Sequence, residues 1–242
     1  MHTKHSPEVS IVLPCLNEVE TLPASIRQIN ETLDRHGIRG EIIVADNRSS
    51  DGTGMVAGHM GAHVVRVPER GYGNAIQGGV RRATAPFIIM GDPDGSYDFS
   101  YIPQFVHELK NGYDLVVGNR FKGGIRAGAM SPLHFVGNRM LTGMGNALFH
   151  TKALDHHCGI RAFTKSALSR MHIHTPHFVF APEMIIRATM MGMRVKEIPV
   201  TLRPDRRTRH HTYIHVIRDG FQNLAMMLRC WRIRHRLQRI AC

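Results

Sequence analysis

Short apolar runs alternate with segments of helical spacing through the first half of the chain. Residues 21–34 place Leu and Ile side chains on one face of a helix, and a second helix is predicted at residues 73–83. The apolar runs, which have the length of buried strands, occupy residues 9–14, 41–46, 63–67 and 86–90. This alternation predicts an α/β fold with a parallel, doubly wound sheet and a site at the carboxyl ends of its strands.

The second half of the chain has a less regular pattern. Its predicted strands and helices occupy residues 102–110, 114–118, 137–149, 182–191 and 194–202. Residues 122–132 are rich in glycine and basic side chains and predict a loop. Residues 214–240 have the pattern of a strongly basic amphipathic helix or helix pair. Without a repeat or a clear linker, we expect one domain over residues 1–212 and a helical segment over residues 213–242.

The charge balance points to an anionic partner. Lys and Arg number 31 against 19 Asp and Glu, and 17 His add latent positive charge. Arginines are densest in residues 203–239. Such a balance favours a nucleic acid, a membrane surface or a phosphorylated substrate. With 43% hydrophobic residues, the chain can also build a substantial core.

Targeting signals are not evident in the sequence. The first residues lack the apolar stretch of a signal peptide, and no uncharged run approaches the length of a bilayer span. The four cysteines are far apart, without the spacing of a zinc site or a secreted disulfide scaffold. Reduced thiols and a cytoplasmic location are therefore expected.

Two carboxylates follow the apolar run at residues 86–90. Asp92 and Asp94 flank Pro93, and a glycine comes next. Asp, Pro and Gly are ordinary turn residues, so a surface turn is one interpretation. The other is a metal pair, because carboxylate oxygens suit Mg²⁺ or Mn²⁺, and such metals often bridge to phosphates.

Polar side chains at two other strand ends favour the metal interpretation. Asn17 and Glu18 follow the first strand, and Asp46 ends the second. In a doubly wound sheet these ends lie along one edge, beside Asp92 and Asp94. After the third strand, a glycine-rich loop at residues 70–75 leads into a helix, which suits close backbone approach to a phosphate.

The order and spacing of these motifs resemble the family 2 glycosyltransferases of the GT-A fold. Within that family, the chain is most similar to the polyprenyl-phosphate (dolichyl-phosphate) mannose or glucose synthases. The matching motifs lie at residues 12–18, 42–53, 70–75, 91–96, 117–121, 155–163, 183–184, 197–200 and 203–209. The resemblance implies a Rossmann-like, mixed and mostly parallel sheet flanked by helices, with a nucleotide-sugar half over residues 1–120 and an acceptor half over residues 121–212.

The resemblance also implies roles for individual residues on the donor side. Asp92 and Asp94 would hold Mg²⁺ or Mn²⁺ beside the diphosphate of a nucleotide sugar. Ser96 stands where relatives often carry Gln, and Ser is a shorter ligand. The residues implied in nucleotide-sugar binding are Pro14, Asn17, Glu18, Asp46, Asn47, Gly71, Asn74, Asp92 and Pro93.

On the acceptor side, the resemblance implies a cluster of arginines around a phosphate. A phosphate monoester is already ionised near neutral pH, so its attack needs no strong general base. A hydroxyl acceptor would need one, and Asp155 and Glu183 are the candidates, each with a structural alternative as a cap or a helix-end charge. With the metal-bound Asp94, the other residues implied in catalysis are Arg120, Arg139, Arg203 and Arg209.

Three functions follow from these features. The first is metal-dependent, inverting transfer from a UDP-glucose-type donor or GDP-mannose to polyprenyl phosphate, with the basic helix and Trp231 on an anionic membrane surface. The second keeps the fold but uses a hydroxyl of a small metabolite or glycan. The third, a nucleic-acid-binding protein, gives no reason for carboxylates at strand ends, where they would repel phosphate, so we expect no nucleic-acid partner.

Overall fold

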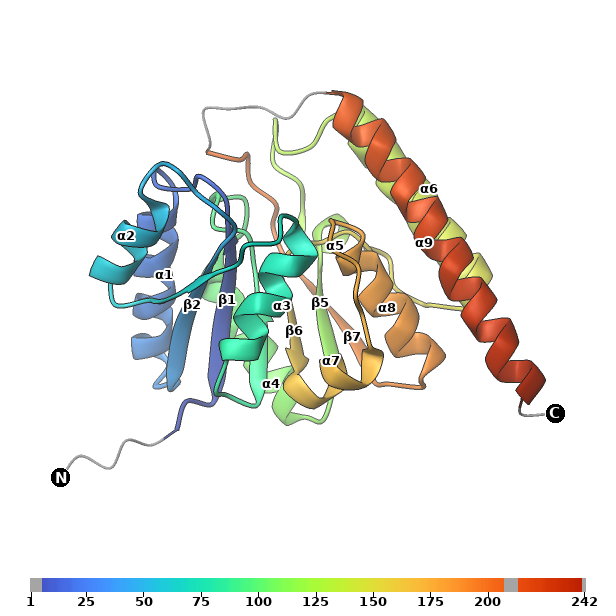
Figure 1. Ribbon diagram of the computed structural model, residues 1–242, viewed down its shortest axis with the longest axis horizontal. Coiled ribbons are helices and arrows are strands. Elements are labelled where there is room, and N and C mark those ends of the chain that lie inside the picture. Colours follow the sequence, from blue (N-terminus) through green and yellow to red (C-terminus); the bar gives the residue numbers. More distant parts are fainter. Residues whose placement is uncertain (1–5, 207–212, 241–242) are drawn as a thin grey trace.

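A seven-stranded sheet forms the centre of the computed structural model (Figure 1). The structure describes the fold of residues 6–206 and 213–240, and the side chains of residues 6–206 and 218–234. The sheet order is β3-β2-β1-β4-β6-β5-β7. The strands are β1 (Val9–Cys15), β2 (Gly40–Asp46), β3 (His63–Arg66), β4 (Phe87–Met90), β5 (Leu115–Asn119), β6 (Arg161–Thr164) and β7 (Val195–Pro199).

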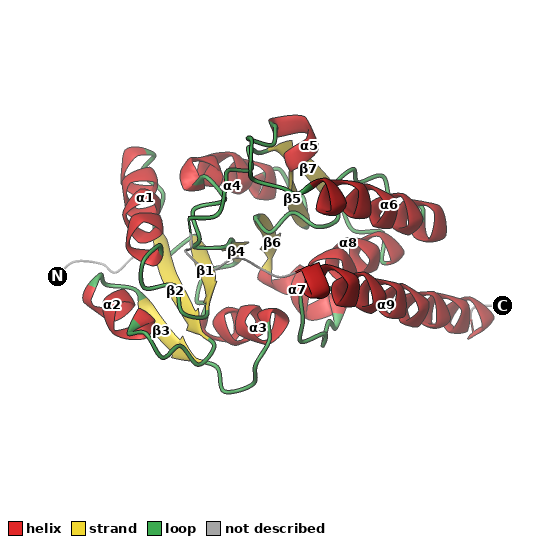
Figure 2. Ribbon diagram, turned by 90° about the horizontal axis from the view of Figure 1, so that it is seen from above, coloured by secondary structure: helices red, strands yellow, loops and turns green. Residues whose placement is uncertain are grey.

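Helices cover both faces of this sheet. Figure 2 shows α1 and α4 along one face and α3 along the other. The helices of the first half are α1 (Leu22–Arg35), α2 (Thr53–His59), α3 (Tyr72–Arg82) and α4 (Ile102–Lys110), with a 3₁₀ turn, η1 (Phe99–Tyr101), before α4. Those of the second half are α5 (Arg120–Gly123), α6 (Pro132–Phe149), α7 (Lys165–Met171), α8 (Phe180–Met190) and α9 (Tyr213–Ile240).

The hydrophobic pattern of α1 explains how the sheet is covered. Leu22, Ile26 and Ile29 are fully buried on the face that packs on the core, as the sequence predicts. Pro23 lies in the first turn of the helix, where its missing N–H would have no intrahelical partner anyway. All of β1 is buried as well, so the sheet and α1 share one continuous core.

Strand register brings three chain segments to one edge of the sheet. Cys15 at the end of β1 pairs with Asp46 at the end of β2, and Val12 pairs with Met90 at the end of β4. All three strands are parallel, so their carboxyl ends and the loops that follow lie together. This part of the sheet confirms the doubly wound pattern predicted from the sequence.

The strands of the first half, β1 to β4, pair in parallel as the alternating pattern predicts, whereas β6 of the second half runs antiparallel to both β4 and β5. The strand was not predicted: its four residues are too short for a clear periodic signal, and fully buried Arg161 breaks the apolar run. The mixed, mostly parallel sheet implied by the family resemblance is confirmed.

The two longest described helices, α6 and α9, run side by side away from the sheet (Figure 1). α9 also packs on α8, and a second small core joins Met226, Met227 and Cys230 of α9 to Phe149 and Ile186. The predicted boundary after residue 212 lies outside the described residues. None of the described helices combines the length and apolar composition that a bilayer span requires.

At Gly73, α3 packs closely against the loop before α8. A Cβ at this position would lie 2.1 Å from the carbonyl oxygen of Thr175. We expect Gly73→Ala to lower the free energy of unfolding by about 1–3 kcal/mol, since the backbone must shift. In the control Gly143→Ala, the new Cβ meets nothing within 4 Å in α6, so helix propensity should stabilise by up to about 1 kcal/mol. Equal urea unfolding curves for both variants would contradict the expectation.

Candidate active site

A cavity of about 400 Å³ opens at the carboxyl ends of β1, β2 and β4. Ten residues were predicted for the donor and metal site, and seven of them line it. These seven are Pro14, Glu18, Asn47, Gly71, Asp92, Pro93 and Asp94. The structure therefore gathers most of the predicted donor-side residues around one space, although they come from four separate loops.

The turn that carries Asp92 and Asp94 is firmly held. The Ser25 hydroxyl of α1 donates to the Pro93 carbonyl oxygen at 2.9 Å. Ser96 donates to Asp94 Oδ1 from its backbone N–H at 2.9 Å and from its hydroxyl at 2.5 Å. A Cβ at Gly159 would lie 2.4 Å from Asp92 Oδ2, so only glycine allows this close approach. Ser96 thus orients a carboxylate, which is a different task from binding a metal directly.

The remaining predicted donor residues connect loops beside the cavity. Asn17 adopts a left-handed backbone (φ 59°), and its Oδ1 accepts a hydrogen bond of 2.8 Å from the Ser50 backbone N–H. Asp46 Oδ1 accepts one of 2.9 Å from the backbone N–H of Ser49. Asn74 donates to the Arg70 carbonyl oxygen at 3.1 Å. These three side chains do not line the cavity themselves, but their hydrogen bonds hold the loops beside it.

The glycine-rich loop is anchored by Asn47. The Asn47 side chain accepts from the Gly71 N–H at 2.8 Å and donates to the Val67 and Glu69 carbonyl oxygens at 3.1 and 2.7 Å. Gly71 (φ 134°) lies so close to Pro176 that a Cβ would sit 2.2 Å from its carbonyl oxygen. Contact with the Pro176 backbone therefore explains, at least in part, why a glycine is needed at position 71.

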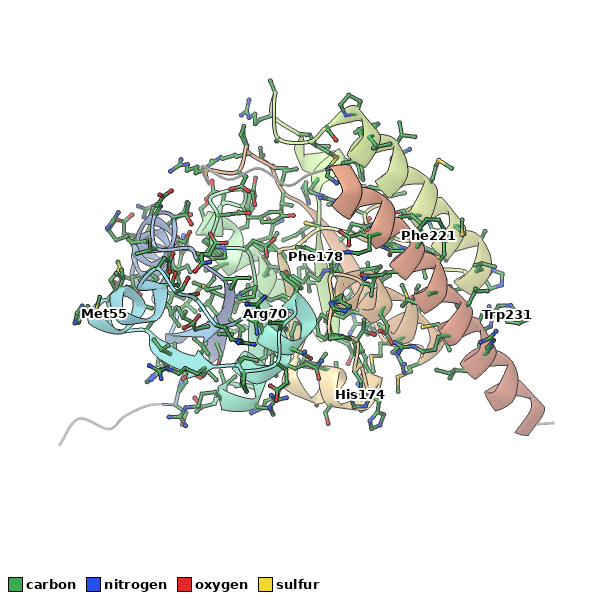
Figure 3. All side chains as sticks on the ribbon, turned by 45° about the horizontal axis from the view of Figure 1, so that its top comes forward. Met55, Arg70, His174, Phe178, Phe221 and Trp231 are labelled. Carbon is green, nitrogen blue, oxygen red and sulfur yellow. The ribbon has the colours of Figure 1, made fainter. Side chains whose placement is uncertain are left out.

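Aromatic rings close one side of the cavity. The ring of Tyr72 stacks on that of Phe178, with centroids 4.4 Å apart and planes within 16°. Burial, and next the negative charge of Asp92, raise the pKa of the Tyr72 hydroxyl well above its usual value. Tyr72 therefore stays neutral in this site. Figure 3 labels Phe178 and Arg70, which both line this cavity.

Asp155 is committed to a buried ion pair with Arg120. Its Oδ2 accepts from Arg120 Nε at 2.7 Å and from the Arg120 backbone N–H at 3.0 Å, while Oδ1 accepts from Nη2 at 2.8 Å. Burial alone would raise the pKa of Asp155, but these hydrogen bonds and the charge of Arg120 outweigh it and hold that pKa below its ordinary value. Neither residue lines the cavity.

Glu183 is committed to ion pairs too. Its fully buried carboxylate accepts from Arg187 Nε at 2.7 Å and from Arg229 Nη2 at 3.0 Å, and it also contacts the Thr175 hydroxyl. Arg187 is one turn away on α8, whereas Arg229 comes from α9. Glu183 therefore fastens α9 to the body of the protein and lies outside the cavity lining.

Two of the three other predicted arginines, Arg203 and Arg139, have protein partners as well. Arg203 Nη2 donates to Asp98 Oδ2 at 2.6 Å. The guanidinium of Arg139 lies over the Phe121 ring, 5.2 Å from its centroid. Arg209 lies outside the described residues. Arg139 and Arg203, like Arg120, are absent from the cavity lining.

Two arginines that were not predicted do line the cavity. Arg70 comes from the glycine-rich loop, and Arg218 comes from α9. Both segments stand out in the sequence, but whether either side chain faces the cavity depends on tertiary contacts that a loop or helix pattern does not show. The remaining lining residues that were not assigned are Cys15, Leu16, Tyr72, Ala75, His177, Phe178, Asp219 and Gln222.

Comparison with known proteins identifies the family. The model of glycosyl transferase family 2 matches residues 10–171. The chain belongs to glycosyl transferase family 2. This confirms the resemblance drawn from the motifs, and with it the prediction of a glycosyltransferase.

Two relatives with named activities are similar to this chain over most of its length. The low-salt glycan biosynthesis hexosyltransferase Agl6 of Haloferax volcanii is 33% identical over 225 residues, which cover 92% of this chain and 54% of Agl6. The chain thus spans about half the length of that relative. A dolichyl-phosphate hexose transferase of the same organism is 28% identical over 196 residues, covering 81% of this chain and 83% of the relative.

Solved structures agree on the fold. A crystal structure of glucosyl-3-phosphoglycerate synthase from Mycobacterium tuberculosis, in complex with Mn²⁺, UDP and glucosyl-3-phosphoglycerate, superposes with a TM-score of 0.74 at 21% identity. The match covers 93% of this chain and 80% of that structure. It confirms the predicted GT-A architecture.

The paired state of Asp155 predicts how stability depends on pH. A carboxyl whose folded pKa is depressed stabilises the protein above its unfolded pKa, about 3.9, and loses that contribution as pH falls through the folded value. We expect Asp155→Asn to cost about 3 kcal/mol near neutral pH, because it leaves Arg120 buried and unpaired. Below about pH 4 the difference from wild type should shrink.

Urea unfolding at pH 7 and pH 3 measures this effect. Asp34→Asn, on the exposed face of α1, is the control and should change stability little at either pH. A cost for Asp155→Asn that stayed constant between the two pH values would contradict the assignment.

Proposed function

We propose that this protein transfers a hexose from a nucleotide sugar to a polyprenyl phosphate. The observation that carries the proposal is that both predicted bases, Asp155 and Glu183, have fully buried carboxylates that form ion pairs with arginines. A hydroxyl must lose its proton as it attacks and needs a base within reach, whereas a phosphate monoester attacks as an anion. The name of the dolichyl-phosphate hexose transferase among the relatives supports this acceptor class.

Asp92 and Asp94 fit a divalent metal beside the donor. Both carboxylates open on the cavity from one short turn, and hard oxygen donors suit Mg²⁺ or Mn²⁺. No group of three or more His, Cys, Asp or Glu placed to hold a metal exists within the described ranges, so substrate oxygens or water would complete the set. Such a metal would neutralise the leaving diphosphate. The Mn²⁺ and UDP of the mycobacterial synthase structure support this part of the proposal.

The protein's own groups position the donor. Pro14, Glu18 and Asn47 line the side where the base and ribose would lie, and Gly71 lines the part of the cavity where the diphosphate would lie. Asn17, Asp46 and Asn74 would contribute indirectly, because their hydrogen bonds hold the loops beside the cavity. The preferred donor in this proposal is a UDP-glucose-type nucleotide sugar, and GDP-mannose is the alternative. The transfer would invert the configuration at the anomeric carbon. In-line approach of the acceptor then depends on orientation more than on proton transfer.

The acceptor half contributes by holding the metal turn. The Arg203 backbone N–H donates to the Ser96 carbonyl oxygen at 2.9 Å, and that of Arg206 donates to the Asp94 carbonyl oxygen at 3.0 Å. Through its ion pair with Asp155, Arg120 orders the loop that leads into β6. Arg203 and Arg120 are therefore positioning residues, while Arg139 and Arg209 stay candidate contacts to the acceptor.

A second candidate function is transfer to a hydroxyl of a small metabolite or glycan. One observation favours it: Asp219 of α9 lines the cavity, and its side chain is 37% exposed. A carboxylate in that position could accept the proton of a hydroxyl. The mycobacterial synthase, whose crystallised product is glucosyl-3-phosphoglycerate, is a structural neighbour consistent with this alternative.

The two outer helices suit a peripheral place on the cytoplasmic face of an anionic membrane. α6 exposes Leu133, Val136 and Met140, and α9 exposes Phe221 and Trp231. Such apolar rows on neighbouring helices, flanked by arginines, match the pattern of surface-bound amphipathic helices. This location would also give the enzyme access to a lipid-linked acceptor.

An activity assay tests the proposed reaction. Purified protein with UDP-glucose or GDP-mannose, Mn²⁺ and farnesyl phosphate should form a glycosylated lipid phosphate. Chelation of the metal should abolish the product, and Asp94→Asn should lower turnover by roughly 100-fold or more, because the metal and diphosphate lose a fixed partner. Asp34→Asn serves as the surface control. A product formed only on hydroxyl acceptors, and lost in Asp219→Asn, would replace this proposal with the second one.

Liposome binding tests the membrane location through Trp231, the single tryptophan of the chain. Its emission should shift to the blue when vesicles containing anionic phospholipid are added, and less so with neutral vesicles. Replacing the α6 residues Val136 and Met140 by Ser, with Met55→Ser on α2 as the control, should weaken vesicle binding several-fold. Unchanged emission in anionic vesicles would sink the idea.

A further inference from the structure

We infer that α9 supplies the subsite for the acceptor's phosphate, with Arg218 as its cation and Gln222 as its second contact. This inference rests on the proposed function and names the part of the site that receives the acceptor. Both residues line the same cavity as Asp92 and Asp94. They stand four positions apart on one helix, so their side chains lie on one face.

Arg218 keeps its hydrogen-bonding capacity for a ligand. Among the described residues, its ion pair is with the neighbouring Asp219, and Arg218 Nε lies 3.7 Å from Asp219 Oδ1. That distance is beyond a hydrogen bond. By contrast, Arg120 and Arg203 have carboxylate partners at 2.6–2.8 Å. The Arg218 side chain is 62% exposed, so an incoming anion can reach it without breaking a tight pair.

Gln222 offers a buried polar group without a protein partner. Its Oε1 is shielded from solvent and has no hydrogen bond within the described part of the chain. A buried polar atom is costly unless a ligand or water satisfies it. Rotation of the terminal amide presents either the oxygen or the NH₂ group, so Gln222 can donate to a phosphate oxygen.

Charge divides the cavity between the two substrates. Glu18, Asp92 and Asp94 come from the strand ends and make the donor side acidic, so that side needs a metal to hold phosphate. Arg70 comes from the loop that Asn47 anchors, also on the donor side. Arg218 is the cavity arginine contributed by α9, and its planar fork suits two oxygens of a phosphate monoester.

The exposed face of α9 continues from this subsite as an apolar row. Phe221, Leu224, Leu228 and Trp231 follow one another at helical spacing and are all at least 36% exposed. Figure 3 shows Phe221 and Trp231 along this helix. A prenyl phosphate has a phosphate head and a long apolar tail. On α9 the head would bind Arg218, and the tail would contact the apolar row.

The test compares farnesyl phosphate with farnesol, which lacks the phosphate. Binding to the intact chain is measured by calorimetry in the presence of UDP and Mn²⁺. Arg218→Ala should weaken farnesyl phosphate about 10- to 100-fold, since charged hydrogen bonds are lost. Arg218→Lys should recover part of this loss, and Gln222→Leu should cost less than Arg218→Ala. The exposed Arg232→Ala on the same helix is the matched control and should change nothing.

Three further readings separate a binding role from a structural one. Arg218→Ala should leave UDP affinity, farnesol affinity and the thermal midpoint unchanged. Farnesyl phosphate binding that Arg218→Ala does not weaken would overturn this subsite while leaving the proposed function intact. Wild-type protein that binds farnesyl phosphate no better than farnesol would overturn both, because the acceptor class itself would then be wrong.

Discussion

The buried pair between Arg120 and Asp155 is the interaction on which the arrangement of the site depends. Arg120 follows β5, and Asp155 lies within the loop that leads from α6 into β6. The Asp155 backbone N–H also donates to Glu197 Oε1 of β7 at 3.0 Å, so one carboxylate and its own backbone join three neighbouring strands. Removing two charges from water is costly, and the two-pronged contact of the Arg120 guanidinium with both Asp155 oxygens offsets that cost.

The loop held by this pair determines where the metal turn can lie. Four residues after Asp155, the Gly159 backbone N–H donates to the Tyr97 hydroxyl at 2.8 Å, and Gly159 borders Asp92. Fully buried Arg161 then closes the loop by donating to the carbonyl oxygens of His156 and Cys158 at 2.6 and 2.8 Å. The acidic turn therefore rests on a scaffold whose own charges are internally satisfied.

The residues that the sequence assigned to the donor side lie together around one cavity, whereas those assigned to the acceptor side do not, for a physical reason. Strand ends such as Asp46 and Asp92 converge by sheet topology alone, so residues far apart in sequence can be placed together. The arginines carry no such constraint: whether a long side chain binds a ligand or a protein carboxylate depends on tertiary contacts. Arg120 and Arg203 found partners in Asp155 and Asp98, which periodicity cannot reveal. The short strand β6 escaped notice for a similar reason, since Arg161 interrupts its pattern.

The attachment of α9 by Glu183 and Arg229 makes that helix part of a rigid unit with α8. One face of α9 forms a wall of the cavity while another is exposed as an apolar row. If the protein binds a lipid surface as proposed, contact with that surface and occupancy of the cavity would act on the same helix. Thermodynamic reciprocity follows: if a bilayer stabilises the placement of α9 that binds acceptor, the acceptor must strengthen the hold on the bilayer by the same factor.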